Sequence, residues 1–154
     1  IKNSLDFRKY QNLFSITSQD TYLIDGTIKE NIMFGSENIE SENKMSEALK
    51  FSRLEKMLDD LKLGLNSQVG STLKQLSSGQ KQRISIARSV YSDREILIFD
   101  EATNALDEEN EKKIFENIKK LKSKKTIIII SHNMQNLKIC DRIFKVEDKA
   151  LIKI

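Results

Sequence analysis

The chain has 154 residues, of which 38% are apolar and 32% are charged, so it can form one globular domain with a buried core. Its 26 basic and 23 acidic residues give a net charge of +3 and are interspersed, which argues against a nucleic-acid-binding surface. The single cysteine excludes an internal disulfide, and no apolar run reaches the roughly 18 residues that a membrane span requires.

The first half of the chain predicts one strand followed by helices. Residues 13–17 alternate apolar and polar side chains, which is typical of a strand. Residues 27–34 form a short amphipathic stretch that Gly35 closes. Apolar residues three and four positions apart then predict a helix from residue 45 and another over 54–61.

The second half predicts helices that alternate with apolar strands. A helix is expected from residue 77 to about residue 91. Residues 95–100 and 126–131 are short apolar runs, typical of strands that are buried on both faces of a parallel sheet. Asp107 can cap the helix between them, and residues 142–154 predict two short strands.

This order of elements predicts an α/β fold. Strands that alternate with helices at this spacing favour right-handed crossovers and a mainly parallel sheet. Residues 36–90 are expected to form an all-helical insert. The core of the domain is then divided between residues 1–35 and residues 91–154.

Two adjacent acids, Asp100 and Glu101, lie where the first strand of the second half is expected to end. Ligands of open α/β sheets bind beyond the carboxyl ends of strands. Because successive strand residues point in opposite directions, we expect the two acids to have different tasks. Asp100 can hold Mg²⁺ through water, and Glu101 can orient or deprotonate an attacking water. The alternative is a solvated acidic strand end.

A serine- and glycine-rich segment opens the helix that is expected from residue 77. Free backbone N–H groups and the helix dipole favour an anion there, and Gly79 lets a phosphate approach the backbone. Ser77 adds a hydroxyl donor, and Ser78 and Gln80 complete the segment. The alternative is a plain helix cap, but the sequence Lys81–Arg83 that follows makes the phosphate-binding interpretation more specific.

The only histidine, His132, directly follows the second apolar strand. We therefore expect it beside Asp100 and Glu101, where its ring can donate to the terminal phosphate of a nucleotide. The alternative is a structural histidine. Gln19 closes the strand at residues 13–17, and its amide can reach the metal or the water.

Together these residues resemble the nucleotide-binding domain of an ABC transporter from about residue 8 onward. Each motif alone is weak, but the combination is specific. A departure is Ser78, because the family usually has glycine there. The matches are Gln19 to the Q-loop, Leu76–Gln80 to the signature sequence, Ile96–Glu101 to Walker B with the catalytic glutamate, Ala105–Asp107 to the D-loop and His132 to the switch histidine.

The resemblance implies a partial P-loop NTPase core, mainly a parallel sheet, with an all-helical signature subdomain. It also implies two domains that dock head to tail around ATP and Mg²⁺ at the cytoplasmic face of a membrane. The partners would be a second such domain and the transmembrane domains of a transporter, with no nucleic acid. Asp107 would lie at the dimer interface. Ser77, Ser78, Gly79 and Gln80 would serve the partner's ATP, and Gln19, Asp100, Glu101 and His132 would serve this chain's own.

The Walker A pattern, G-x-x-x-x-G-K-[ST], is absent, because none of the five glycines precedes a Lys-Ser or Lys-Thr pair. In the family this loop precedes the Q-loop, so we expect it upstream of Ile1 in a longer parent protein. Since Glu101 and His132 are both present, the parent is expected to hydrolyse ATP. The chain alone is expected to be inactive and to bind ATP weakly.

Two short segments resemble the exporter branch of the family. Thr27–Ile32 follows the Q-loop as it does in exporters, and Val69 and Gly70 precede the signature. The second match is partial, because Ser71 and Leu73 stand where exporters often carry glutamate and glycine.

Two other classes of ABC protein remain open. Chromosome-maintenance and DNA-repair ATPases share most of these motifs, but their Q-loop accompanies Walker A, whereas Gln19 accompanies the signature here. Those ATPases also carry heptad repeats, which this chain lacks before Leu76. The other class is a ribosome-acting or noncatalytic regulatory protein, against which the intact Glu101 and the weak net charge argue.

Overall fold

The computed structural model describes residues 6–36, 40–70 and 76–154. The elements of the first half are α1 (Phe7–Gln11), β1 (Phe14–Thr17), β2 (Gly26–Thr27), α2 (Ile28–Met33), α3 (Glu42–Ser52), α4 (Glu55–Asp59), a 3-10 turn (Gly64–Asn66) and β3 (Gln68–Val69). Those of the second half are α5 (Ser78–Tyr91), β4 (Ile96–Asp100), α6 (Glu108–Leu121), β5 (Thr126–Ile130), α7 (Met134–Leu137), β6 (Phe144–Glu147) and β7 (Ala150–Lys153).

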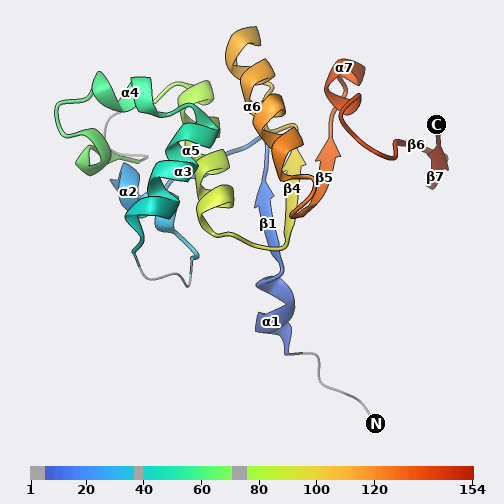
Figure 1. The fold of residues 1–154 in the computed structure, drawn as a ribbon, viewed down its shortest axis with the longest axis horizontal. Coiled ribbons are helices and arrows are strands. Elements are labelled where there is room, and N and C mark those ends of the chain that lie inside the picture. The colour runs from blue at the N-terminus through green and yellow to red at the C-terminus, as the bar shows by residue number, and fades with distance from the viewer. Residues whose placement is uncertain (1–5, 37–39, 71–75) are drawn as a thin grey trace.

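The main sheet has three parallel strands in the order β1-β4-β5 (Figure 1). Ile16 lies opposite Ile98, which in turn lies opposite Ile128. The chain reaches β4 from β1 through the helical region, and β5 from β4 through α6. The predicted α/β fold with a parallel sheet is therefore confirmed.

Helices pack on one face of this sheet. Leu97 and Phe99 of β4 form a buried cluster with Ile86 of α5 and with Ile114 and Ile118 of α6. This cluster is the hydrophobic core of the sheet region, and its apolar burial holds α6 against β4.

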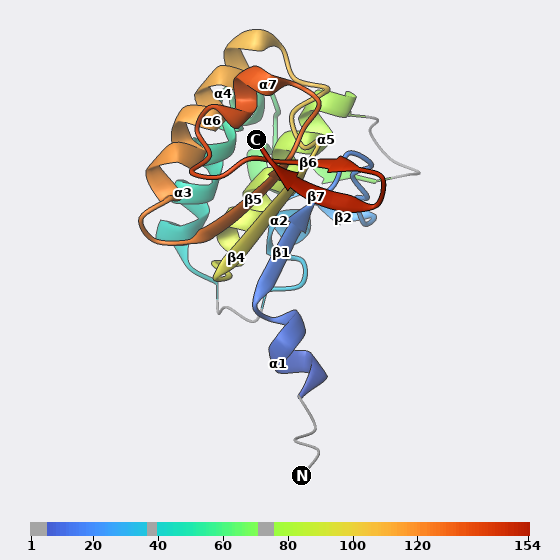
Figure 2. The same ribbon diagram turned by 90° about the vertical axis from the view of Figure 1, so that its right-hand side faces the viewer.

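The opposite face of the sheet is largely exposed. Ile16, Ile128 and Ile130 are 62%, 44% and 50% exposed, and Figure 2 looks onto this face, with the β6–β7 hairpin in front of it. The prediction that both apolar strands are buried on both faces is wrong for the described residues. An apolar run indicates that both faces of a strand can be buried, but it does not tell which segments cover them.

The helical region has a second core, which is built around α2, α3 and α5. Its fully buried side chains include Ile28, Ile32, Leu54, Ile84 and Tyr91. The region is mostly helical but not all-helical as expected, because it contains the short strand β3, which pairs with β2. The residues Ser71 and Leu73, on which part of the exporter resemblance rests, lie outside the described residues.

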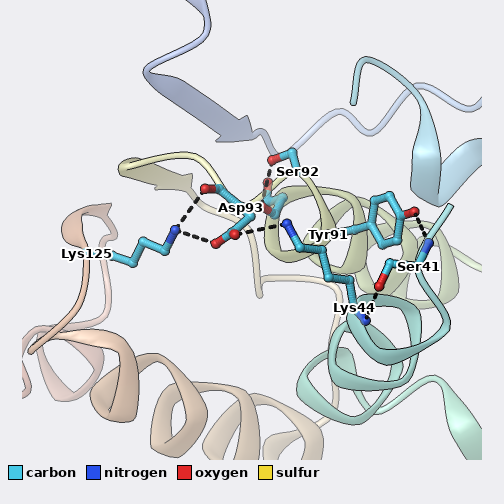
Figure 3. A network of polar contacts seen from close by, with 7 residues as sticks. Ser41, Lys44, Tyr91, Ser92, Asp93 and Lys125 are labelled. Carbon is cyan, nitrogen blue, oxygen red and sulfur yellow. Dashed lines mark hydrogen bonds and ion pairs between the residues drawn. The ribbon is translucent and has the colours of Figure 1, made fainter. Parts of the chain in front are cut away.

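Asp93, in the turn between α5 and β4, joins the helical region to the sheet (Figure 3). The Lys125 ammonium, directly before β5, donates to the Asp93 carbonyl oxygen at 2.9 Å and to its Oδ1 at 2.6 Å. The Lys44 ammonium of α3 donates to Oδ2 at 3.1 Å. Beside them the Tyr91 hydroxyl accepts from the Ser41 backbone N–H at 3.3 Å.

No helix in the described ranges 6–36, 40–70 and 76–154 combines the length and the hydropathy that crossing a bilayer requires.

Candidate active site

The carboxyl ends of β1, β4 and β5 lie at one edge of the sheet, because the three strands are parallel. Asp100 is the last residue of β4, and Glu101 follows it. His132 lies two residues after β5, and Gln19 two residues after β1. The structure therefore brings these four predicted residues to the same edge.

Glu101 and His132 are in direct contact. Oε1 of Glu101 accepts from the backbone N–H of His132 at 3.0 Å and lies 3.4 Å from the Nε2 atom of the His132 ring. Glu101 is only 8% exposed, whereas the His132 side chain is 98% exposed. The pair thus combines a buried carboxylate, fixed by a backbone hydrogen bond, with a solvent-exposed imidazole that a ligand can reach.

Glu101 leaves the strand through a left-handed backbone conformation, with φ of 49°. Its N–H still donates to the carbonyl oxygen of Ile130 in β5, at 3.0 Å. Strand alternation alone predicts that the Asp100 and Glu101 side chains point in opposite directions. In the structure β4 ends at Asp100, and the turn at Glu101 directs its carboxylate toward His132.

Asp100 faces the exposed side of the sheet. Its partner in the register is Ile130, and it shares a face with Ile98. Within residues 6–36, 40–70 and 76–154, no hydrogen bond or ion pair engages its carboxylate. The same residues contain no group of three or more His, Cys, Asp or Glu side chains that could hold a metal ion on their own.

The signature helix α5 begins with a reciprocal cap. The Gln80 backbone N–H donates to Ser77 Oγ at 3.2 Å, and the Ser77 N–H donates to Gln80 Oε1 at 3.0 Å. This capping box confirms the predicted helix start. The cap uses the Ser77 hydroxyl oxygen and the Gln80 amide oxygen as acceptors. The exposed Ser78 side chain takes no part in the cap.

Gly79 is required by packing within the chain. A Cβ atom at this position would lie 2.6 Å from the carbonyl oxygen of Ala105, in the D-loop. The sequence analysis assigned this glycine to close approach by a phosphate. The structure adds a second reason, because the first turn of α5 rests directly on the D-loop backbone.

Asp107 caps α6, as predicted. The backbone N–H of Asn110 donates to its Oδ1 at 2.9 Å, and the Asn110 amide donates to its Oδ2 at 2.6 Å. These hydrogen bonds lower the pKa of Asp107. The carboxylate is exposed and ionised, and it stands at the end of the turn that begins at Glu101.

Gln19 lies beside the start of α5. It lines a cavity of about 390 Å³ together with Asp20, Tyr22, Ser78 and Lys81. The predicted contact of the Q-loop with a metal at Asp100 remains a prediction, whereas its proximity to the signature helix is a feature of the structure that the sequence analysis did not anticipate.

A buried glutamine, Gln82, contacts the turn after Glu101 and is not among the predicted site residues. Its amide bonds to the backbone of both Glu101 and Ala105. A signal for it exists in the sequence. Gln82, Ser85, Ile86 and Ser89 recur with the spacing of one helix face, and all four are buried. This stripe of α5 faces the sheet, whereas Ile84, Ala87 and Tyr91 are buried in the core of the helical region.

Comparison with known proteins gives concordant results. The profile of the ABC transporter family matches residues 2–104. The chain is 37% identical over 140 residues to "ATP-dependent lipid A-core flippase 2" of Colwellia psychrerythraea, covering 91% of this chain and 24% of that protein. It is 36% identical to an "ATP-dependent lipid A-core flippase" of Neisseria meningitidis, covering 91% of this chain and 22% of that protein.

The fold agrees with these sequence relatives. The solved "Structure of a bacterial Atm1-family ABC exporter with ATP bound" superposes with a TM-score of 0.86 and 31% identity, over 94% of this chain and 25% of that one. The chain thus spans about a quarter of the length of the relatives that it matches. The chain belongs to the ABC transporter family.

Proposed function

We propose that the chain is part of the ATP-hydrolysing module of an exporter-type ABC transporter, where it couples ATP hydrolysis to transport across a membrane. The flippases and the exporter that it resembles support this proposal over a DNA-repair ATPase or a non-transport regulatory protein. The near-neutral charge pattern gives no support to nucleic acid as a partner.

The observation that carries the proposal is the contact between Glu101 and His132. It places a buried carboxylate and an exposed imidazole at the carboxyl ends of two neighbouring parallel strands, where α/β enzymes bind their ligands. Phosphoryl transfer depends mainly on positioning and charge stabilisation. Glu101 would position the attacking water, and His132 would stabilise the charge on the phosphate.

In the proposed reaction, Glu101 orients the attacking water and accepts its proton. The water oxygen then bonds to the γ-phosphorus as the bond from phosphorus to the bridging oxygen breaks. His132 donates from its ring to the γ-phosphate oxygens, where negative charge is concentrated. The ring is 98% exposed, so it is accessible to a phosphate although its Nε2 lies 3.4 Å from Glu101 Oε1, and the backbone N–H of His132 holds Glu101 independently of the ring.

The residues fit a magnesium ion that is bound with the nucleotide. Mg²⁺ usually takes one or two protein ligands and completes its shell with water and phosphate oxygens, so a cluster of three acids is not required. The Asp100 carboxylate, which no other described side chain engages, would hold it, and Gln19 would add an amide oxygen. When bound, the ion would neutralise charge on the phosphates.

A second nucleotide-binding domain would complete the site, and transmembrane domains would take up its motion at the cytoplasmic face of the membrane. Ser77, Ser78, Gly79 and Gln80 lie at the tip of α5, where the backbone N–H groups of Ser78 and Gly79, which the capping box does not use, suit a partner's ATP. Asp107 would lie at the contact between the two domains. The chain has no Walker A pattern, so alone it would bind ATP weakly.

The proposal is tested by ATP hydrolysis in the transporter that contains this chain, purified and placed in lipid vesicles. Wild type is expected to hydrolyse ATP, and Glu101→Gln to lose about 10²-fold or more of kcat while still binding Mg-ATP. Glu109→Gln is the matched control, because this acid on α6 is 78% exposed and outside the site. Unchanged hydrolysis by Glu101→Gln would contradict the proposed role.

A further inference from the structure

Gln82 lies one turn into α5 and is 2% exposed. Its Nε2 donates to the carbonyl oxygen of Glu101 at 3.4 Å, and its Oε1 accepts from the N–H of Ala105 at 3.0 Å. One side chain therefore bridges the two ends of the turn that carries Glu101 into the D-loop. Both ends of its amide are satisfied by that turn, as a buried amide requires.

This turn has few internal hydrogen bonds to hold its shape. The Asn104 N–H donates to the Glu101 carbonyl oxygen at 3.3 Å, and the Leu106 N–H donates to the Thr103 carbonyl oxygen at 2.9 Å. Glu101 itself has a left-handed backbone conformation, which is uncommon for a residue with a side chain. Such a conformation persists only when its surroundings impose it.

Gln82 connects this turn to the helix tip. Gly79 and Gln82 are three residues apart, so they lie on one face of α5, and both meet Ala105. Gln82 therefore gives the first turns of α5 a direct contact with the backbone of the Glu101 turn.

We propose that Gln82 is a positioning residue for hydrolysis, which holds the Glu101 turn in register with His132 and links it to the α5 tip. This inference rests on the proposed function. Gln82 is separated from the reacting atoms by the Glu101 backbone, so its loss should affect the chemical step more than nucleotide binding. Misplacement of a catalytic group by a small distance is enough to lower a rate strongly.

The test compares Gln82→Met, which keeps the length but loses both hydrogen bonds, with Ser89→Ala on the same helix. Ser89 is also 2% exposed, and its hydroxyl bonds to Thr17 at 2.6 Å and to Ser15 at 3.0 Å, away from the turn. Both variants lose buried polar contacts of α5, but only the first loses contacts to Glu101. Both are measured in the transporter that contains the chain.

We expect Gln82→Met to lower kcat about tenfold or more with KM for ATP within about twofold of wild type. Ser89→Ala should leave kcat within about twofold, whatever its effect on the unfolding temperature. Hydrogen exchange at the Ala105 amide should speed up in Gln82→Met and stay unchanged in Ser89→Ala, because among the described residues this amide donates to Gln82.

A second variant keeps the test decisive if Gln82→Met fails to fold. Gln82→Glu retains an oxygen to accept from Ala105 but loses the donor to the Glu101 carbonyl, and it is expected to show the same fall in kcat at unchanged KM. Wild-type kcat in either folded variant would overturn the positioning role, as would an equal fall in Ser89→Ala. Absence of hydrolysis in wild type would overturn the proposed function, and the inference with it.

Discussion

The hydroxyl of Thr103, in the turn after Glu101, donates to Oε1 of Glu111 on α6 at 2.8 Å. The same oxygen accepts from the side-chain amide of Asn136 on α7 at 2.9 Å. Since α7 follows His132 directly, Glu111 links the segment that carries Glu101 to the segment that carries His132. The turn is thus held by Gln82 on one side and by Glu111 on the other.

We predict that Glu111→Ala costs about 1–3 kcal/mol in the free energy of unfolding, because it leaves the buried Thr103 hydroxyl and the Asn136 amide without their acceptor. It should also lower kcat, because the turn loses one of its supports. Glu111→Gln keeps an acceptor oxygen and should recover part of both losses.

Urea unfolding and steady-state hydrolysis measure the two effects of the Glu111 variants. The control is Glu109→Ala on the same helix, whose exposed ion pair with Arg53 is worth about 0–1 kcal/mol. Equal effects of Glu111→Ala and Glu109→Ala would show that the bridge to Thr103 and Asn136 has no structural role.

His132→Ala separates the two contributions of this residue. The variant keeps the backbone N–H that holds Glu101, and the side chain that it removes is 98% exposed. We therefore expect the unfolding temperature to stay within about 2 °C of wild type, because exposed substitutions cost little. Hydrolysis is expected to fall about 10²-fold or more, because a donor to the developing charge is lost.

Calorimetric unfolding and single-turnover hydrolysis are the measurements for His132→Ala. A large loss of stability would show that the ring is structural, which is the alternative that the sequence leaves open. Hydrolysis at the wild-type rate would remove the ring from the proposed reaction.

Gly79→Ala is predicted to destabilise the contact between α5 and the D-loop. The added Cβ would lie 2.6 Å from the Ala105 carbonyl oxygen, and backbone atoms cannot move aside as a flexible side chain can. Overpacking of this kind costs about 1–3 kcal/mol. The comparison variant is Ser78→Ala, which shortens an exposed side chain at the same helix tip and should change stability by less than about 0.5 kcal/mol. Chemical denaturation measures the free energy of unfolding of both variants. An unchanged value for Gly79→Ala would show that the backbone at Ala105 can move to accommodate the added methyl group.

Much of the fold follows from local patterns in the sequence. The strands β1, β4 and β5 form where the sequence predicts strands, although in β1 the polar Thr17 is buried and the apolar Ile16 is exposed. Asp107 caps its helix as predicted, and Ser77 forms the helix cap that was the alternative for its segment. The helices α1 and α7 were not predicted, because each has only about one turn and no repeated apolar stripe can develop over that length.

The site was predictable as far as strand order determines it. Parallel strands bring Glu101 and His132 to one edge whatever the helices do. The left-handed turn at Glu101 and the contacts of Gln82 and Glu111 depend on which helices pack around that turn. Such tertiary contacts have no local signature beyond a buried stripe, which is why the sequence predicted the placement of Glu101 and His132 but not the contacts of Gln82 and Glu111.

The ion pairs of Asp93 predict how stability changes in acid. Partial burial acts to raise the pKa of Asp93, but hydrogen bonds and charge from Lys125 and Lys44 outweigh it, so the pKa lies below its usual value. A carboxylate whose pKa is lowered by folding stabilises the protein above its unfolded pKa of about 3.9. That contribution is lost as pH falls through the lower pKa of the folded state.

Asp93→Asn tests this linkage, because asparagine tolerates the left-handed backbone at this position, where φ is 56°. The Asp93 side chain is 51% exposed, so solvent screens the pair, and we expect a loss of at most about 1 kcal/mol at pH 7 in low salt. The difference between variant and wild type should shrink below about pH 4 and in about 0.5 M salt. Urea unfolding across that pH range is the measurement. A difference that grows toward low pH would contradict the assignment, since protonation of Asp93 removes the charge that the two lysines stabilise.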